Sequence, residues 1–230
     1  MSLKIYRALK SPWLGQKFGD SKACCKWSIT SNRPVMPWVI VAKNSAGLCP
    51  PGYKSFYEEG LKQKGHNGQD WTAYFREPIY FNVVADTEWQ VLERGEDLGY
   101  GKYLEIRSLS PVLDGKHVKF IYVHAHKNLA PVGSKVVAGQ HIQEANSTGA
   151  SSGHHLHFGM KFCDEDGNTL NGNNGYSGYI DPAPWTDGQS VTDFLGFRQR
   201  LTLSLQLSQL QLQLLYLLQS LRTRIGALLN

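Results

Sequence analysis

The stretch SSGHHLHFGMKF, residues 151–162, holds three of the eight histidines of a 230-residue chain. From His155 onward, apolar residues alternate with polar or small ones, which predicts a β-strand. Side chains two positions apart share one face of a strand. His155 and His157 therefore point the same way, and Leu156 points to the other face. Such a pair can place two imidazoles on one metal ion, or one on a metal and one beside a reacting group. A pair of surface histidines would give the same pattern.

Two other segments carry histidines. GHNGQDW, residues 65–71, contains His66 and Asp70, two residue types that bind zinc. Its Asn-Gly step is a turn signal, which favours a turn leading into a strand over a helix. YVHAHKN, residues 122–128, places His124 and His126 on a predicted strand, and alternation does not say which of them matters. One His, one Asp and a further His would leave an open zinc position for water, as in catalytic sites. Because no HExxH motif is present, the remaining histidines are the candidates for proton transfer.

The surrounding sequence favours an antiparallel β domain. Between residues 79 and 142, short β-type runs are separated by glycine-containing turns. Residues 24–55 are rich in Pro, Cys and Trp and predict loops with one strand at WVIVA, residues 38–42. Six aromatic residues are candidates for a groove wall, although core positions are the alternative for most of them: Trp27, Trp38, Tyr53, Trp71, Tyr74 and Tyr100.

Composition sets broad limits. Hydrophobic residues make up 41% and charged residues 19% of the chain, which is typical of a globular protein. The net charge of +5 favours anionic surfaces such as nucleic acid, membranes or bacterial cell-wall polymers. The four cysteines form no CxxC pair, which argues against a zinc knuckle. Cys24 or Cys25 could bridge to Cys49 in an oxidising compartment, or all four thiols could be free. We find no signal-peptide pattern and no apolar run of transmembrane length.

Six segments, in order along the chain, resemble the M23 family of zinc metallopeptidases, the lysostaphin-like or LytM-like endopeptidases. They are GQKFGD (residues 15–20), GHNGQDW, GYGKYLEIRS (residues 99–108), YVHAHKNLAPVGSKVVAGQHI (residues 122–142), TGASSGHHLHFGM (residues 148–160) and YIDPAPW (residues 179–185). The similarity spans about residues 14–185, and six ordered segments are far more specific than any single motif.

This resemblance implies one Zn²⁺ per chain, bound by His66, Asp70 and His157. It implies that His124 and His155 are the catalytic histidines, while His126 and His154 fall where the family has no required histidine. The implied fold is a mainly β, antiparallel hybrid β-sandwich with the site in a groove. The implied activity is hydrolysis of peptide bonds in the stems or cross-bridges of bacterial peptidoglycan, by a protein that acts at the cell wall and could be phage-associated.

Three positions depart from the family pattern. Gly159 replaces the acidic residue of HLHFE, Gln69 replaces an apolar residue before the Asp, and Ser108 replaces a histidine. None of them is one of the five implied site positions, so we expect a changed pocket shape and not a lost activity. The alternative function is a non-catalytic cell-wall-binding or structural module, for example of a phage particle or a secreted assembly. VGSKVVAGQHI also resembles biotinyl and lipoyl carrier turns, but it lacks their lysine motif. We expect no nucleic-acid partner.

The last part of the chain differs in composition. After Phe194 the sequence is rich in Leu and Gln and contains no acidic residue. Leucines that alternate at residues 201–207 would suit a strand, whereas leucines at 203, 207, 210, 214, 217 and 221 follow the heptad spacing of a packed helix. We favour a helix, because Leu, Gln and Arg are good helix formers. We therefore expect a peptidase domain over residues 1–193 and a helix over residues 194–230. That helix would serve self-association or docking to a partner first, packing on its own domain second, and a membrane surface last.

Overall fold

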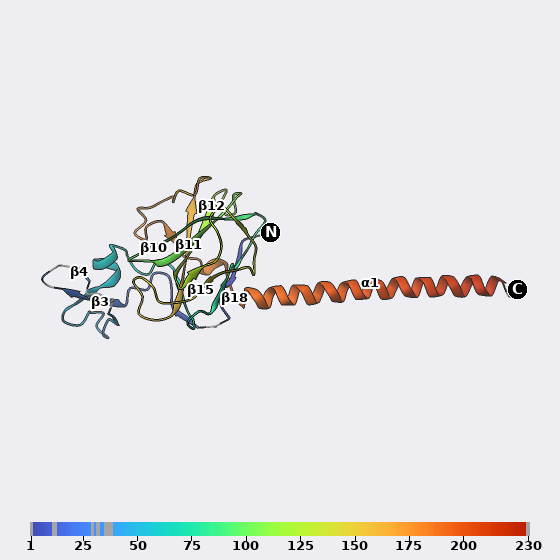
Figure 1. The fold of residues 1–230 in the computed structure, drawn as a ribbon, viewed down its shortest axis with the longest axis horizontal. Coiled ribbons are helices and arrows are strands. Elements are labelled where there is room, and N and C mark those ends of the chain that lie inside the picture. Colours follow the sequence, from blue (N-terminus) through green and yellow to red (C-terminus); the bar gives the residue numbers. More distant parts are fainter. Residues whose placement is uncertain (1, 11–12, 29, 31–32, 35–38, 229–230) are drawn as a thin grey trace. The chain divides into compact units, whose positions relative to one another are not determined.

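A computed structural model describes residues 2–228, apart from residues 11–12, 29, 31–32 and 35–38. Contacts between Cα atoms divide the chain into two units, Met1–Val191 and Thr192–Asn230. The first unit is built almost entirely of short strands, and the second is helical (Figure 1). The structure thus confirms the predicted class, mainly β with antiparallel sheets and a C-terminal helix. The roles assigned above to the two parts stay predictions.

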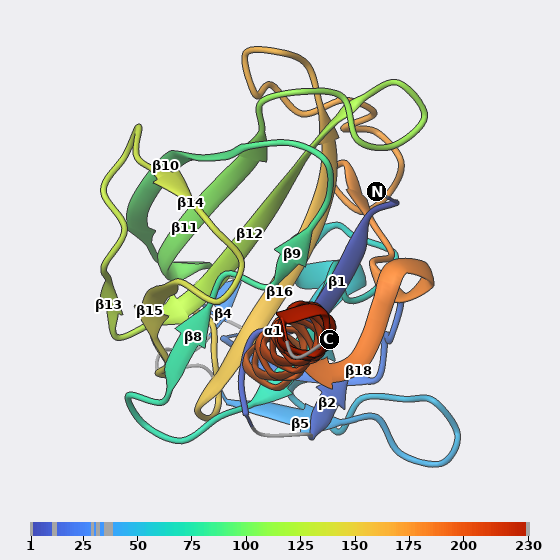
Figure 2. The ribbon, with the colours of Figure 1, turned by 90° about the vertical axis from the view of Figure 1, so that its right-hand side faces the viewer.

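One eight-stranded sheet forms the centre of the first unit. Its long neighbours β10, β11, β12 and β16 lie side by side in Figure 2. All the pairings within it are antiparallel. In spatial order, the strands are β14 (Lys135–Val136), β10 (Trp89–Asp97), β11 (Gly101–Ser108), β12 (His117–Ala125), β16 (His155–Cys163), β7 (Gln69–Thr72) and β2 (Leu14–Gln16), with β17 (Tyr179–Ile180) paired to β16.

The main core lies on one face of this sheet. Leu156, Phe158 and Met160 of β16 are at most 1% exposed and pack there, as the alternation in the sequence predicts. The ring of Phe158 stacks on Phe120 of β12 at 5.4 Å between centroids. Burial of each such side chain stabilises the fold by about 1.5–3 kcal/mol. These residues hold β16 in register, so its histidines lie on the opposite face.

Two three-stranded sheets border the central one. One contains β18 (Thr186–Ser190), β1 (Lys4–Arg7) and β9 (Val83–Val84). The other contains β13 (Lys127–Asn128), β15 (His141–Glu144) and β8 (Pro78–Tyr80). The run PIYFNVVA is therefore divided between β8 and β9, which belong to different sheets. The pairing of β1 with β18 is parallel and brings the two ends of the first unit together.

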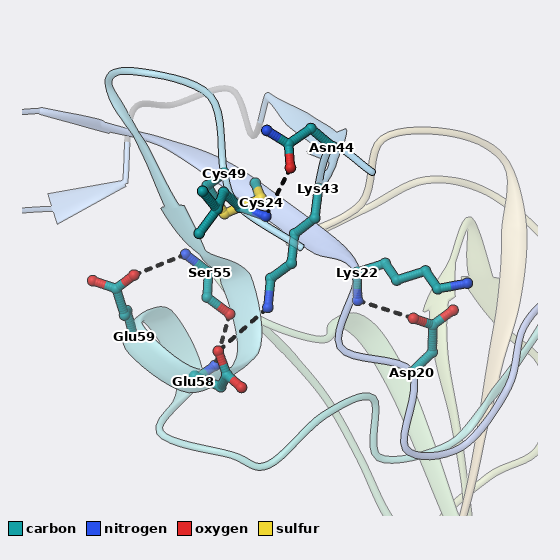
Figure 3. Close-up of a disulfide and its surroundings, with 10 residues drawn as sticks. Asp20, Lys22, Cys24, Lys43, Asn44, Cys49, Ser55, Glu58 and Glu59 are labelled. Carbon is teal, nitrogen blue, oxygen red and sulfur yellow. Dashed lines mark hydrogen bonds and ion pairs between the residues drawn. A yellow bond between two sulfur atoms is a disulfide. The ribbon is translucent and has the colours of Figure 1, made fainter. Parts of the chain in front are cut away.

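Residues 23–61, called the insert below, form a small sheet of their own. It contains β4 (Arg33–Pro34), β3 (Ala23–Ser28) and β5 (Ile40–Ala42), with β6 (Tyr53–Ser55) also paired to β3. A π-helical turn, η1 (Phe56–Leu61), follows β6, and the Ser55 side chain accepts a hydrogen bond from the Glu58 amide at its start. A disulfide joins Cys24 to Cys49 (Figure 3). Cys25 and Cys163 are free and buried. The sequence left open whether Cys24 or Cys25 pairs with Cys49, and the structure contains the Cys24–Cys49 bond.

The first unit ends after a 3₁₀ turn, η2 (Ala183–Trp185), and strand β18. Helix α1 (Val191–Leu228) begins at the last residue of the first unit and forms the second. The helix preference is confirmed, and the alternating leucines do not form a strand. Ten leucines on α1 are 49–67% exposed: Leu201, Leu203, Leu205, Leu207, Leu210, Leu212, Leu214, Leu215, Leu217 and Leu218. Within the described residues, no helix meets the length and apolarity that a membrane span requires.

Candidate active site

Three neighbouring strands place the candidate site residues on one face of the central sheet. In the antiparallel β7–β16 pair, Asp70 is directly opposite His157. His66 lies in the irregular segment before β7, which bends at Gly68, and four residues later the chain reaches Asp70 in the strand. His124 lies near the end of β12, whose residue Val123 pairs with His157. The register of the sheet therefore brings together residues from three distant parts of the sequence.

Three donor atoms meet at the centre of the site. His66 Nε2 lies 2.8 Å from His157 Nδ1 and 3.0 Å from Asp70 Oδ1, and His157 Nδ1 lies 2.9 Å from the same Oδ1. The other nitrogen of His66, Nδ1, lies 3.0 Å from the Lys17 carbonyl oxygen and donates to it. Nε2 is therefore the nitrogen of the His66 ring that faces the cluster. Two imidazole nitrogens and a carboxylate oxygen within this distance could hold one metal ion.

The charge state of the cluster also suits a cation. Burial alone would raise the pKa of Asp70, but the charges of His155 and His66 and hydrogen bonds from His157 and His66 hold that pKa well below its usual range. Burial lowers the pKa of His157 despite its hydrogen bond to Asp70. Asp70 is thus held as a carboxylate and the neutral form of His157 is favoured, and a carboxylate oxygen and a neutral imidazole are both ligands of zinc. Among the described residues, His157 Nε2 is buried and has no hydrogen-bond partner, so only one nitrogen of this ring makes polar contacts.

Gly68 makes room for this arrangement. A Cβ atom at Gly68 would lie 2.7 Å from His157 ring atoms and 2.6 Å from the Phe158 carbonyl oxygen. Real Cβ atoms do not approach other atoms so closely, so a side chain there would displace the imidazole or the strand. The glycine of GHNGQDW therefore has a geometric role in the cluster.

His124 and His155 flank the three donor atoms. Nδ1 of His124 donates to the Thr148 carbonyl at 2.7 Å, and Nδ1 of His155 donates to the Gly153 carbonyl at 2.8 Å. In each ring Nε2 is the nitrogen that these bonds leave unused, and His155 Nε2 lies 3.7 Å from Asp70 Oδ1. The two ring centroids are 4.7 Å apart. Each ring can thus make a further polar contact through its Nε2.

The backbone at His124 is unusual. Its φ of 66° lies in the left-handed region, which few non-glycine residues adopt. Burial, followed by the nearby charges of His155 and His157, lowers the pKa of His124 to about 3. Strained backbone conformations of this kind cluster at functional sites. The two observations distinguish His124 from the other histidine of its HxH pair.

His126 and His154 lie elsewhere. The Phe75 ring contacts both of them, at 5.2 Å from the His126 centroid and 5.5 Å from that of His154. Within the described residues, neither belongs to the three-donor cluster. This placement agrees with the resemblance, which assigns them no role.

A cavity of about 270 Å³ opens beside the cluster. Of the six aromatic residues considered for a groove wall, Tyr100 lines this cavity, whereas Trp71 belongs to the main core and Trp27 packs on the insert. Tyr74 is 79% exposed, Tyr53 lies in β6, and Trp38 lies outside the described residues. Sequence reasoning missed Tyr57, whose ring centroid lies 5.7 Å from that of His66 and whose hydroxyl donates to Gln16 Oε1 at 2.8 Å. Gln16 belongs to the family-like segment GQKFGD, which is the part of the sequence that could have pointed to a contact at this position.

The positions that depart from the family pattern have local explanations. A Cβ at Gly159 would lie 2.3 Å from Tyr179 Cε1, so the Tyr179 ring fills the space that a side chain would need. Tyr179 is fully buried, and its hydroxyl lies 2.6 Å from that of Tyr100. The hydroxyl of Ser108 accepts a hydrogen bond from the Val118 amide inside the sheet. The structure offers no explanation for Gln69 beyond its burial.

The fold is thus a mainly β domain, and its site contains a His–Asp–His cluster that could hold a metal ion. The family model "Peptidase family M23" matches residues 64–172, which contain all five candidate site residues, and this match places that segment of the chain in the M23 peptidase family. A comparison with curated proteins finds no match.

Several solved structures are similar to the chain. The catalytic domain of the antimicrobial peptidase lysostaphin from Staphylococcus simulans is 29% identical, with 53% of this chain and 78% of that chain covered and a TM-score of 0.39. A mutant catalytic domain of the prophage-encoded M23 protein EnpA from Enterococcus faecalis is 27% identical, with 46% and 75% covered and a TM-score of 0.37. A zinc-containing peptidase from Vibrio cholerae is 20% identical, with 73% and 39% covered and a TM-score of 0.42.

Proposed function

We propose that the protein is a zinc-dependent endopeptidase that hydrolyses peptide bonds in the stems or cross-bridges of bacterial peptidoglycan. The observation that carries this proposal is the triangle of His66 Nε2, Asp70 Oδ1 and His157 Nδ1, with edges of 2.8–3.0 Å, beside two further imidazoles. Membership of a peptidase family supports the reaction. The lysostaphin-like motifs and the net charge of +5 support an anionic wall polymer as the substrate.

In this proposal His66, Asp70 and His157 hold one Zn²⁺ per chain. When bound, the ion lowers the pKa of a water ligand towards neutrality and polarises the peptide carbonyl. His155 Nε2 accepts the proton of the attacking water and delivers it to the leaving amine nitrogen. The hydrogen bond from His155 Nδ1 to the Gly153 carbonyl fixes the tautomer that this transfer needs.

His124 has a related role. Its Nδ1–H is held by the Thr148 carbonyl, so its Nε2 faces the site as an acceptor in the resting state. From this position His124 Nε2 accepts a hydrogen bond from the attacking water and orients it, while the pKa of about 3 keeps the ring neutral and leaves the proton transfer to His155.

The place of action follows from the same proposal. The Cys24–Cys49 disulfide suits an oxidising compartment, such as the periplasm or the extracellular space. We propose that the protein works at the bacterial cell wall, and that α1 mediates assembly or attachment. An association with a phage particle is compatible with this reading.

The test combines metal analysis with mass spectrometry of purified peptidoglycan fragments, with and without a chelator. We expect about one zinc per chain, and His66→Ala, Asp70→Ala and His157→Ala should each release it. Stoichiometric zinc in His157→Ala would contradict the ligand assignment. A metal-loaded, folded protein that leaves peptidoglycan intact would instead favour the non-catalytic wall-binding module.

A matched pair of variants tests the proton-transfer roles. His124→Ala should keep zinc and structure but lose about 10²–10⁴-fold in turnover. His126→Ala, two residues away on the same segment, should keep nearly full turnover, because its ring contacts Phe75 and not the cluster. Equal losses of turnover in both variants would contradict the assignment of His124 as the catalytic histidine of this pair.

A further inference from the structure

Exposed aromatic side chains gather in one part of the first unit. Among its described residues, the aromatic residues with exposed side chains are Trp13, Tyr74 and Phe75, at 71%, 79% and 53%. Tyr74 and Phe75 lie in the loop after β7, and the amide of Thr72 at the end of β7 donates to the Trp13 carbonyl at 2.9 Å. The three residues therefore belong to neighbouring segments. Exposed apolar surface that gathers in one place marks an interaction site.

Two histidines to which the proposed reaction gives no role border Phe75. The centroid of the Phe75 ring lies 5.2 Å from that of His126 and 5.5 Å from that of His154. His126 is half-buried, and His154 is exposed. We call Tyr74, Phe75, His126 and His154 the aromatic platform. It combines two large aromatic rings with two imidazoles, whose nitrogens donate or accept hydrogen bonds.

The loop that carries Tyr74 and Phe75 is fixed in place. The Tyr74 amide donates to a carboxylate oxygen of Glu77 at 3.0 Å, and the Arg76 amide donates to the Ala145 carbonyl at 2.8 Å. The guanidinium of Arg76 also pairs with Glu144 at 2.9 Å. A loop held in this way has little conformational freedom left to lose when a ligand binds, which favours binding.

The platform adjoins the candidate active site. The Ala73 amide donates to the His154 carbonyl at 3.1 Å, which joins the loop to the residue before His155. His154 also lines a hollow of about 780 Å³ that reaches Asp70 and His155. A polymer with one part at the donor atoms can therefore extend over the platform with another part.

The surroundings of the platform suit a sugar chain. His126 lines a hollow of about 300 Å³, around which the other side chains are polar or charged: Arg94, Lys102, Lys127 and Asn128. A sugar ring has an apolar face of C–H groups, which stacks on an aromatic ring, and an edge of hydroxyl oxygens, which accept hydrogen bonds from such donors. A stable protein–protein interface needs about 20–30 residues a side, far more than the platform contains. The platform also has no aliphatic side chain for a lipid.

Resting on the proposed function, we propose that the aromatic platform binds the glycan strand of peptidoglycan while the attached peptide lies at the His–Asp–His cluster. Sugar rings stack on Tyr74 and Phe75, and the imidazoles of His126 and His154 form hydrogen bonds with their polar edges. The platform is thus a substrate-binding surface outside the groups that take part in hydrolysis. It raises the affinity for the polymer and leaves the chemical step unchanged.

The first experiment uses the full chain loaded with zinc and two substrates that share the peptide around the bond that mass spectrometry identifies. One substrate is the peptide alone, and the other carries the peptidoglycan disaccharide of N-acetylated sugars on the same peptide. We expect the disaccharide to lower KM by about 10- to 100-fold, the effect of two stacked pairs of rings, and to leave kcat unchanged. Equal KM values for the two substrates would overturn the proposal.

Variants at exposed positions test the platform directly. Tyr74→Ala and Phe75→Leu should each raise KM for the sugar-bearing substrate by about three- to tenfold and cleave the peptide alone as the wild type does. Phe75→Tyr keeps a ring and should keep the benefit of the sugar. The matched control is Tyr216→Ala, which removes a tyrosine 74% exposed on α1 and should behave as the wild type. An unchanged KM in Tyr74→Ala and Phe75→Leu, or equal losses in Phe75→Tyr and Phe75→Leu, would overturn the proposal.

The failure of the proposed function is distinguishable from the failure of this inference. A protein that cuts neither substrate refutes only the former. The platform is then tested by NMR titration of the full chain with the tetramer of N-acetylglucosamine, which contains no stem peptide, and the ring protons of His126 and His154 are the reporters. We expect saturable shifts with an affinity that falls about three- to tenfold in Tyr74→Ala and is unchanged in Tyr216→Ala. Absent shifts, or equal affinities in the two variants, would overturn the inference even if the protein cleaves peptidoglycan.

Discussion

Lys161 offers a test of the electrostatics on the site-bearing face of β16. The residue is only 9% exposed, and its Nζ lies 4.0 Å from the centroid of the Tyr179 ring. Lys119 is directly opposite on β12 and already pairs with Glu105 at 2.8 Å. Burial, then the charge of Lys119, lowers the pKa of Lys161 from 10.5 to about 8, although Glu105 opposes this.

The shift has a definite sign. Below pH 8 the lysine is charged in both the folded and unfolded protein, and its burial destabilises the fold in full. Between pH 8 and 10.5 the unfolded chain binds more protons than the folded chain, so the free energy of unfolding rises with pH. At about 1.4 kcal/mol per pKa unit, the cost below pH 8 is at most about 3 kcal/mol. A variant without the lysine also loses its cation–π contact with Tyr179, which reduces the expected gain in stability by about 1 kcal/mol.

We therefore expect Lys161→Met to be more stable than the wild type at pH 7 by about 2 kcal/mol. The advantage should shrink towards zero as the pH approaches 10.5. Urea denaturation of both proteins at about pH 7, 8.5 and 10 measures the difference between their free energies of unfolding. Because the two proteins are compared at the same pH, the titration of groups that they share cancels. Lys116→Met is the control, because Lys116 is exposed and lies 4.9 Å from the Phe162 ring. A stability difference for Lys161→Met that does not depend on pH would refute the reasoning.

Three other predictions concern the site, the insert and the helix. Gly68→Ala should weaken zinc binding by about tenfold or more in a chelator competition, because its Cβ would meet the His157 ring. The control Gly172→Ala should bind zinc normally, because a Cβ there meets nothing within 4 Å. Cys49→Ser should destabilise the insert by about 3 kcal/mol, seen as faster proteolysis within it, because the bridge closes a loop of 25 residues. A chain ending at Asp193 should stay folded and bind zinc, while light scattering shows a fall in mass to that of a monomer; unfolding of a truncated chain whose full-length form is monomeric would contradict this.

Much of the fold was predictable because its strands follow simple alternation. Leu156, Phe158 and Met160 mark the core face of β16 in the sequence alone. The family assignment was predictable from ordered motifs, and the family model confirms it. The gathering of His66, Asp70 and His157 needed the resemblance, because spacing cannot say that β7 lies beside β16. The roles of these residues stay predictions.

Other features depend on contacts that no local pattern encodes. The carbonyl groups that hold His124 and His155 belong to Thr148 and Gly153, and backbone partners leave no trace in side-chain patterns. The position of the insert depends on long-range contacts such as that of Tyr57 with Gln16, 41 residues apart. The choice between Cys24 and Cys25 was also open, because their separations from Cys49 in the sequence differ by only one residue.

The contact between Gly159 and Tyr179 has an evolutionary consequence. A side chain at position 159 and the present position of the Tyr179 ring exclude each other, since a Cβ there would lie 2.3 Å from the ring. A substitution of Gly159 therefore requires that the ring moves or is replaced, so we expect the residues at these two positions to depend on each other. Statistical coupling between these two positions, which are 20 residues apart, should be visible wherever sequences of both kinds are compared.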